Sequence, residues 1–317
     1  MQGCKKLFQR DKIFLLCLSG VVALTLLFTL FQCRNMIKQD IEMIDMLLGF
    51  HGEEFLAGAE GVWSMLAGMT QYAITNVMKA ALVIVVIAQF VKWNVLEGKR
   101  GKEFQNLLPV KSSACVTYDY ICGILFLWVP AVIMGITVSI LTKPFEQYEQ
   151  MGILNMSGIM DNIWSEVGRE LIIVSFIYSF LVFAKKITRY IPGILLLMLI
   201  CNYMILWVSG TGYSLLWDWG FYNAGYIREY ILFLLMALVF VALSYFCDRK
   251  RDIAGNGLFY FKPVHFLVML MIFAELFSIS VTGIILPSRV MTSVVSLILA
   301  ALVTVGVHYL TWGRKAR

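Results

Sequence analysis

The run YDYICGILFLWVPAVIMGITVSIL, residues Tyr118–Leu141, sets the class of fold, because Asp119 is its only charged residue. An α-helix rises ~1.5 Å per residue and the hydrocarbon core of a bilayer is ~30 Å thick, so a run of this length crosses a membrane as one helix. Seven further apolar runs are Ile13–Phe31, Gln71–Val91, Leu171–Ala184, Ile191–Ser209, Tyr230–Cys247, Val264–Leu286 and Val290–Leu310. The sequence therefore predicts an all-α, polytopic integral membrane protein with about eight transmembrane helices in a single domain, residues 1–317.

The composition supports the same class. Hydrophobic residues make up 60% of the chain and charged residues 15%, and the mean hydropathy is +0.80. A soluble domain of this length needs more charged surface than that. Lipid leaves helices as the spanning structure, since the runs lack the alternating pattern of a barrel strand. The net charge of +6 is interpreted as a topogenic signal with some attraction to membrane lipids, and nucleic-acid binding is not expected.

The distribution of Lys and Arg predicts the orientation of the spans. Cytoplasmic loops carry an excess of basic residues. With eight spans, one side of the membrane receives most of the 26 Lys and Arg residues. The basic segments on that side are residues 5–12, 92–111, 185–189, 249–262 and 314–317. Both termini are therefore predicted to be cytoplasmic.

Three connections fall on the outer side. Segment 34–70 has apolar residues at helical spacing and is expected to form one or two interfacial helices. Segment 142–169 has a similar amphipathic pattern and is expected to lie on or dip into the outer leaflet. Segment 210–228 is rich in Trp and Tyr, which is typical of an interfacial aromatic belt. On the inner side, residues 1–12 form either a short amphipathic helix along the membrane surface or a frayed basic start.

Besides Asp119, which stands at the very start of its run, two charged residues stand deep inside apolar runs. Lys79 and Glu275 each lie roughly 18–20 Å above the inner boundary, counted at helical rise. Intramembrane charges usually face the bundle interior and often pair or line a pathway. Lys79 and Glu275 are thus a candidate intramembrane pair, with either a structural role in fixing helix register or a transport role.

The stretch before the Tyr118–Leu141 run is the most basic internal segment. Residues Asn94–Thr117 read NVLEGKRGKEFQNLLPVKSSACVT. Phe104, Leu107 and Leu108 share one face of a short helix that Pro109 stops. A short amphipathic helix so placed either lies on the membrane or inserts its apolar face into a groove on a cytoplasmic partner.

This stretch resembles the segment between the second and third spans of ABC transporter permeases of the type 2 exporter class. The shared pattern is an acidic residue, a basic cluster, Gly, an acidic residue, a Leu-rich turn, Pro-Val and a basic, Ser-rich exit, found here as EGKRGKEFQNLLPVKSS. In that family the segment is the coupling helix that docks on the ATP-hydrolysing subunit. The resemblance implies a docking surface made of Glu97, Arg100, Glu103, Phe104, Leu107, Leu108, Pro109, Val110 and Lys111. It also implies that residues 1–12 form the family's elbow helix.

Two features depart from the family pattern. Its members often have six spans, whereas eight apolar runs are counted here. They often carry a basic residue early in the third span, where this chain has Asp119 and Tyr120. The resemblance covers roughly the first 140 residues, so the role of the additional spans stays open.

The resemblance implies a multi-pass, non-catalytic transport subunit in a bacterial cell (inner) membrane. No GxxxxGK[ST] motif occurs in the sequence, so ATP hydrolysis is expected to come from a separate cytoplasmic chain. No catalytic residue, cofactor or metal is expected on this chain. ATP and Mg²⁺ are expected on a cytoplasmic ABC ATPase subunit, and a second permease chain, identical or not, is expected beside this one. The exported cargo is expected to be lipid-like, a peptide or drug-like. The alternatives are a secondary transporter that uses Lys79 and Glu275, and an intramembrane enzyme.

Overall fold

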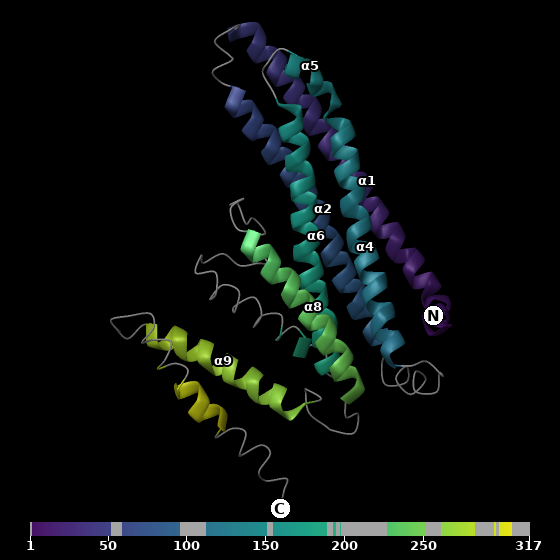
Figure 1. Ribbon diagram of the computed structural model, residues 1–317, viewed down its shortest axis with the longest axis vertical. Helices are drawn as coiled ribbons and strands as arrows, with labels where there is room; N and C mark the ends of the chain where they lie inside the picture. The colour runs from purple at the N-terminus through teal and green to yellow at the C-terminus, as the bar shows by residue number, and fades with distance from the viewer. Residues whose placement is uncertain are drawn as a thin grey trace, which may run out of the picture. The chain divides into compact units, whose positions relative to one another are not determined.

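The computed structural model describes residues 2–51, 59–95, 112–150, 155–188, 193–194, 197, 227–250, 261–282, 295 and 298–305. Almost all of these residues are helical, as predicted from the sequence (Figure 1). The elements are α1 (Gln2–His51), α2 (Ala59–Val95), α4 (Ser112–Leu141), the 3₁₀ turn η2 (Lys143–Phe145), α5 (Glu146–Gln150), α6 (Met156–Ile187), α8 (Ile227–Lys250) and α9 (Lys262–Thr282).

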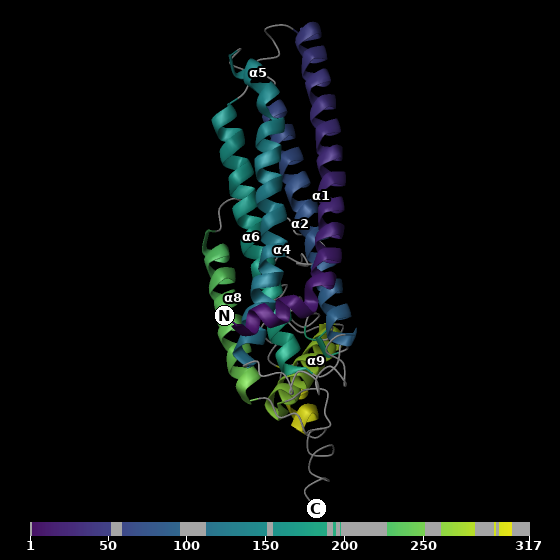
Figure 2. The ribbon, with the colours of Figure 1, turned by 90° about the vertical axis from the view of Figure 1, so that its right-hand side faces the viewer.

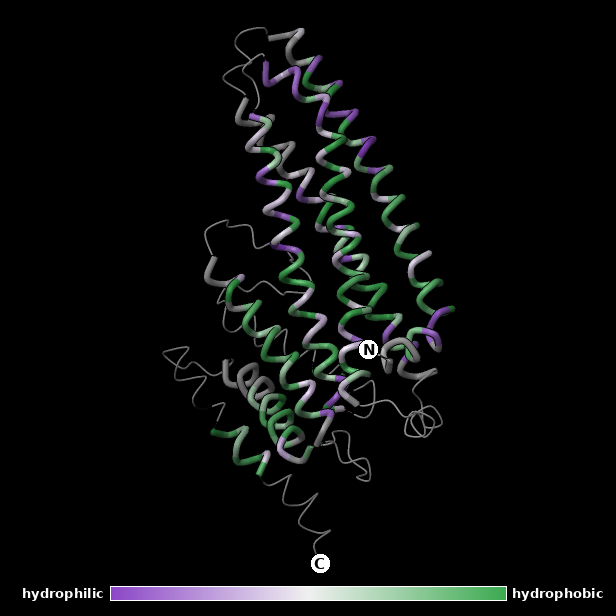
Figure 3. Tube along the Cα trace, turned by 45° about the vertical axis from the view of Figure 1, so that its right-hand side comes forward, coloured by the Kyte–Doolittle hydropathy of each residue, from purple (hydrophilic) through white to green (hydrophobic). Residues whose placement is uncertain are grey.

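Four of the described helical segments are long and apolar enough to cross a membrane, judged by length and composition. They are Asp11–Met46, Thr70–Lys92, Ser113–Gln150 and Met156–Ile187, and Phe233–Asp248 is a shorter apolar helix. Figure 3 shows their hydrophobic residues in green along most of each helix. The total of eight spans and the side on which the termini lie stay predictions.

The chain divides into two compact units, one of residues 1–182 and 223–245 and the other of residues 183–222 and 246–317. The first unit contains α1, α2, α4 and α6, which run side by side in alternating directions (Figures 1 and 2). The bundle has two ends. The end at which α2 terminates is called the Lys92 end, and the opposite end, where α5 lies, is called the Tyr148 end.

Helix α6 forms the centre of this first unit. In its most apolar window 72% of the residues are buried, against 11% for α1. Aromatic rings join it to α8, with centroids 5.0 Å apart for Phe176 and Phe233 and 5.1 Å apart for Phe180 and Phe240. Helix α1 instead exposes much of its apolar surface, which suits contact with lipid.

The N-terminal turns of α1 lie across the Lys92 end. Figure 2 shows this part, the darkest purple of the ribbon, at a steep angle to the rest of α1. Leu7 is buried there, while Phe8 is exposed. Residues 2–12 are therefore helical, as one of the two interpretations expects. Leu7 and Asp11 are buried against the bundle.

The connections predicted to form separate interfacial helices differ from that prediction. Helix α1 continues without a break to His51, and α2 begins at Ala59. The reason is a row of buried residues spaced four, three and four apart. Residues at this spacing lie on one face of a helix and pack against a neighbouring helix rather than on a membrane surface. The members of the row are Cys33, Ile37, Asp40 and Ile44.

Segment 142–169 also differs from the prediction. Ile159 and Ile163 are buried inside the bundle as part of α6, rather than lying on a leaflet. Asn155 caps α6, because its side-chain oxygen accepts from the backbone N–H of Gly158 at 3.1 Å. The hydroxyl of Tyr148 on α5 donates to Asp45 on α1 at 2.6 Å, which fixes the turn to the bundle. Nearly all of segment 210–228 lies outside the described residues.

Candidate functional site

The predicted docking residues lie outside the part of the chain that the structure describes. Glu97, Arg100, Glu103, Phe104, Leu107, Leu108, Pro109, Val110 and Lys111 all fall between the end of α2 at Val95 and the start of α4 at Ser112. Their role therefore stays a prediction. What the structure does describe is how the two helices that carry this segment are held.

A buried ionic triad joins the helix ends on both sides of the segment. Lys92, in the last turn of α2, places Nζ 3.1 Å from Oδ2 of Asp11 on α1 and 3.0 Å from Oδ1 of Asp119 on α4. The side chains are nearly inaccessible, with 4% of Lys92, 0% of Asp11 and 5% of Asp119 exposed. The ring of Tyr118 covers Lys92, its centroid 4.7 Å from Nζ. Three helices are therefore tied together at one ammonium group.

Burial makes this triad sensitive to the loss of any member. Taking charges out of water is expensive, and mutual attraction offsets that expense only when every charge keeps its partner. Loss of Lys92 would leave the carboxylates of Asp11 and Asp119 facing each other in a site without water access. The triad thus holds the three helix ends in one arrangement.

A tyrosine hydroxyl links the triad to α6. The hydroxyl of Tyr178 donates to the backbone carbonyl of Asp119 at 2.6 Å and accepts from the side-chain amide of Gln89 on α2 at 3.2 Å. The ring reaches this position because residue 123 is glycine. A Cβ atom there would overlap Cζ of Tyr178. Gly123 therefore leaves the space on α4 that the ring of Tyr178 on α6 occupies.

A second set of hydroxyl contacts extends the network to α8. Tyr120 donates to the backbone carbonyl of Ser179 at 3.1 Å and lies 3.0 Å from the hydroxyl of Ser244. The hydroxyls of Thr117 and Tyr245 are 2.8 Å apart. Polar contacts therefore cross-link α1, α2, α4, α6 and α8 close to the Lys92 end.

A second charged cluster lies on α6 farther along the bundle. Arg169 forms ion pairs with Glu166 and with Glu170, the latter at 3.4 Å. Glu170 is fully buried and accepts from the hydroxyl of Thr75 on α2 at 3.0 Å. At ~1.5 Å per residue, Thr75 lies ~25 Å from Lys92 along α2. The cluster is thus within the apolar length of α2, toward the Tyr148 end.

Of the candidate pair Lys79 and Glu275, the structure describes the side chain of Lys79 alone. Lys79 is half-buried on α2, one turn from Thr75 and so on the face that meets Glu170. The side chain of Glu275 lies outside the described residues, so the pair stays a prediction. Sequence reasoning missed Glu170 because it assigned the preceding residues to an interfacial segment.

The sequence alone predicts only part of the triad. The sequence analysis interprets Lys92 as one of the basic residues that set the orientation, and Asp119 as a departure from the family pattern. The available signal was that these two opposite charges stand at the ends of neighbouring spans joined by one loop. Asp11 gives no such signal, because its contact with Lys92 depends on how α1 packs against α2.

No protein-family model, curated protein or solved structure matches this chain. Among the residues that the structure describes, no group of three or more His, Cys, Asp and Glu side chains could hold a metal ion. Function must therefore be argued from the geometry of the helix ends and of the buried charges.

Proposed function

We propose that this chain is the membrane-spanning permease subunit of an ATP-driven exporter of the ABC type 2 class. It would be a multi-pass protein of a bacterial inner membrane, with the Lys92 end toward the cytoplasm. The observation that supports this proposal best is the triad of Asp11, Lys92 and Asp119. It joins the two helices that flank the predicted docking segment, and it adds the N-terminal turns of α1 to them.

This arrangement suits the transmission of a displacement from a cytoplasmic partner. An ATPase docked on residues 97–111 would move that segment as it binds and hydrolyses ATP. Since Lys92 and Asp119 hold α2 and α4 together close to the segment, the two helices would shift as one body. Asp11 would carry α1 with them. The pathway for the cargo would then open at the interface with a second permease chain.

The proposed exporter needs two partners, an ATPase subunit and a second permease chain. We place ATP and Mg²⁺ on a separate ABC ATPase subunit, because no GxxxxGK[ST] motif occurs in this sequence. The second permease chain is either a copy of this one or a related chain. The cargo is lipid-like, a peptide or drug-like, in keeping with the apolar surfaces of the bundle.

Co-purification tests the proposal. The tagged chain is expressed from its native operon beside the double variant Leu107→Asp/Leu108→Asp, which places charge on the apolar face of the predicted helix. The matched control is Gln105→Asp/Asn106→Asp, which adds the same charge to the opposite face. We expect an ATPase subunit to come down with wild type and the control and to be lost with the double Leu variant. An ATPase that is absent from wild type, or that is retained equally by all three, contradicts the proposal.

The α6 cluster favours one alternative, a secondary transporter. Ionisable groups buried within apolar helices often line ion pathways, and Arg169 and Glu170 are such groups. Uptake into proteoliposomes separates the two functions. Transport driven by an ion gradient without ATPase and lost in Glu170→Gln would favour the secondary transporter. Transport that requires ATP and the ATPase subunit would favour the exporter.

A further inference from the structure

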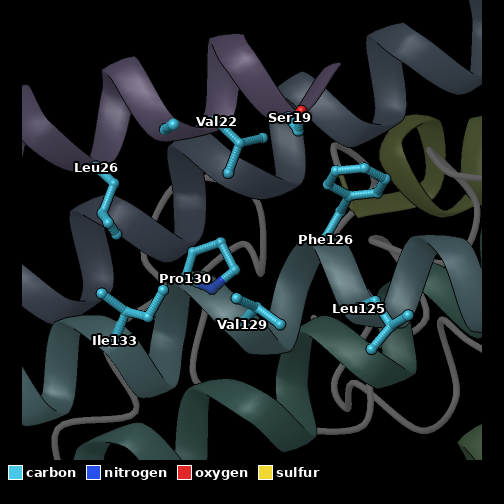
Figure 4. A pocket seen from close by; sticks show the side chains of 9 residues that line it. Ser19, Val22, Leu26, Leu125, Phe126, Val129, Pro130 and Ile133 are labelled. Atoms are coloured by element: carbon cyan, nitrogen blue, oxygen red, sulfur yellow. The ribbon is translucent and has the colours of Figure 1, made fainter. Parts of the chain in front are cut away.

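An apolar groove opens between α1 and α4. Its volume is about 260 Å³. Figure 4 shows its walls, which are formed by Ser19, Val22, Ala23, Leu26, Leu125, Phe126, Val129, Pro130 and Ile133. The one hydroxyl among them is already used, since Oγ of Ser19 donates to the backbone carbonyl of Leu16 at 2.8 Å. The other lining side chains are all apolar, so they offer an occupant mainly carbon contacts.

The groove exists because α1 packs less closely on the bundle between Val22 and Cys33. Val22 is 7% exposed, but none of residues 23–32, all of them described, is buried. On the other wall, Leu125 and Val129 are about half exposed. Counted at helical rise from Asp11 and from Asp119, the groove spans roughly 10–22 Å above the triad. An occupant would thus sit in the half of the apolar layer nearer the Lys92 end.

A basic residue precedes the groove residues of α1. Lys12 comes seven residues before Ser19, which is two helical turns, or ~10 Å along the helix. Its side chain is exposed. The neighbouring carboxylate of Asp11 is fully buried against Lys92 and so leaves the charge of Lys12 available. The sequence adds further basic residues in the same N-terminal turns.

These features together match an anionic phospholipid. We infer that the groove holds one acyl chain of such a lipid, with the phosphate beside Lys12. A carbon-lined groove suits the chain, and basic residues at the membrane surface attract anionic headgroups. The inference requires membrane insertion but does not depend on the exporter function.

Native mass spectrometry of the full chain, released from detergent, tests the inference. The chain is titrated with phosphatidylglycerol and with phosphatidylcholine of identical acyl chains. Wild type should retain phosphatidylglycerol with about fivefold higher affinity, the factor that corresponds to ~1 kcal/mol for one basic residue near the headgroup. Lys12→Gln should lower the affinity for phosphatidylglycerol to that for phosphatidylcholine.

Groove variants test the acyl-chain part. Ala23→Phe should fill the groove and reduce retention of both lipids, whereas Leu24→Phe on the exposed opposite side of α1 should behave as wild type. If Ala23→Phe fails to elute as a folded species, Leu125→Trp fills the same groove from α4. Retention of phosphatidylglycerol by the folded groove variants at the wild-type level would overturn the inference. So would an unchanged lipid preference in Lys12→Gln, or a dimer whose formation displaces the lipid. None of these measurements needs an ATPase, so their failure leaves the exporter proposal to its own test.

Discussion

Replacing Lys92 by leucine should destabilise the bundle by about 3–5 kcal/mol, the usual range when one partner of a buried ion pair is removed. Lys92 is 4% exposed, and its Nζ lies within 3.1 Å of Asp11 and 3.0 Å of Asp119. The substitution leaves both carboxylates buried without a counter-charge. Domains commonly unfold at only ~5–15 kcal/mol, so the loss should be easy to measure.

The triple variant Lys92→Leu/Asp11→Asn/Asp119→Asn separates charge from packing. Replacing a whole buried ion group with neutral residues is often neutral or stabilising, so this variant should recover most of the stability lost by Lys92→Leu. Lys38→Leu is the matched control, because Lys38 forms an ion pair with Glu42 at 3.6 Å on the exposed surface. It should leave stability nearly unchanged.

Reversible urea or thermal unfolding of the purified chain in one fixed detergent measures all three variants. The reasoning is refuted if Lys92→Leu unfolds as wild type does. It is also refuted if the triple variant is no more stable than the single one, because the loss would then arise from packing rather than from unpaired charge.

Three further substitutions probe the helix contacts, each by the same unfolding measurement. Gly123→Ala should destabilise by about 1–3 kcal/mol, because its Cβ would overlap the ring of Tyr178; an unchanged midpoint would mean that α4 and α6 are farther apart than described. Tyr178→Phe should lower stability by about 1–2 kcal/mol, since it removes the hydroxyl that donates to the carbonyl of Asp119; a stabilising effect would contradict that bond. Asn155→Ala should lower stability by ~1 kcal/mol through loss of the α6 cap, and Asn155→Asp, which keeps a capping oxygen, should not.

The sequence predicts the helical class well because the hydrophobicity of a run depends only on its own residues and not on what packs against it. Runs such as Gln71–Val91 and Tyr118–Leu141 need no partner to be recognised, and both lie within described helices. The amphipathic pattern around Ile37 and Ile44 was harder to interpret. The same spacing suits a helix on a membrane surface and a helix packed in a bundle, and only the neighbouring helices decide between them.

The buried charges could not be predicted for a related reason. Asp11, Lys92 and Asp119 are far apart in the chain, and their meeting depends on the relative heights of three helices. A shift of one turn in any of them would separate the charges by ~5 Å. Thr75 and Glu170 meet under the same condition. Sequence spacing fixes faces within one helix but not the register between helices.

Pro130 gives α4 an uneven stiffness. A proline inside a helix has no N–H to donate to the carbonyl of the residue four positions earlier. That backbone hydrogen bond is therefore missing, and the helix bends most easily there. Below it, Asp119, Tyr120 and Gly123 bind α4 firmly to α2, α6 and α8. A force applied at the Lys92 end would therefore turn the part of α4 before Pro130 as a lever. The bending would concentrate at Pro130, beside the groove, where the backbone hydrogen bond is missing.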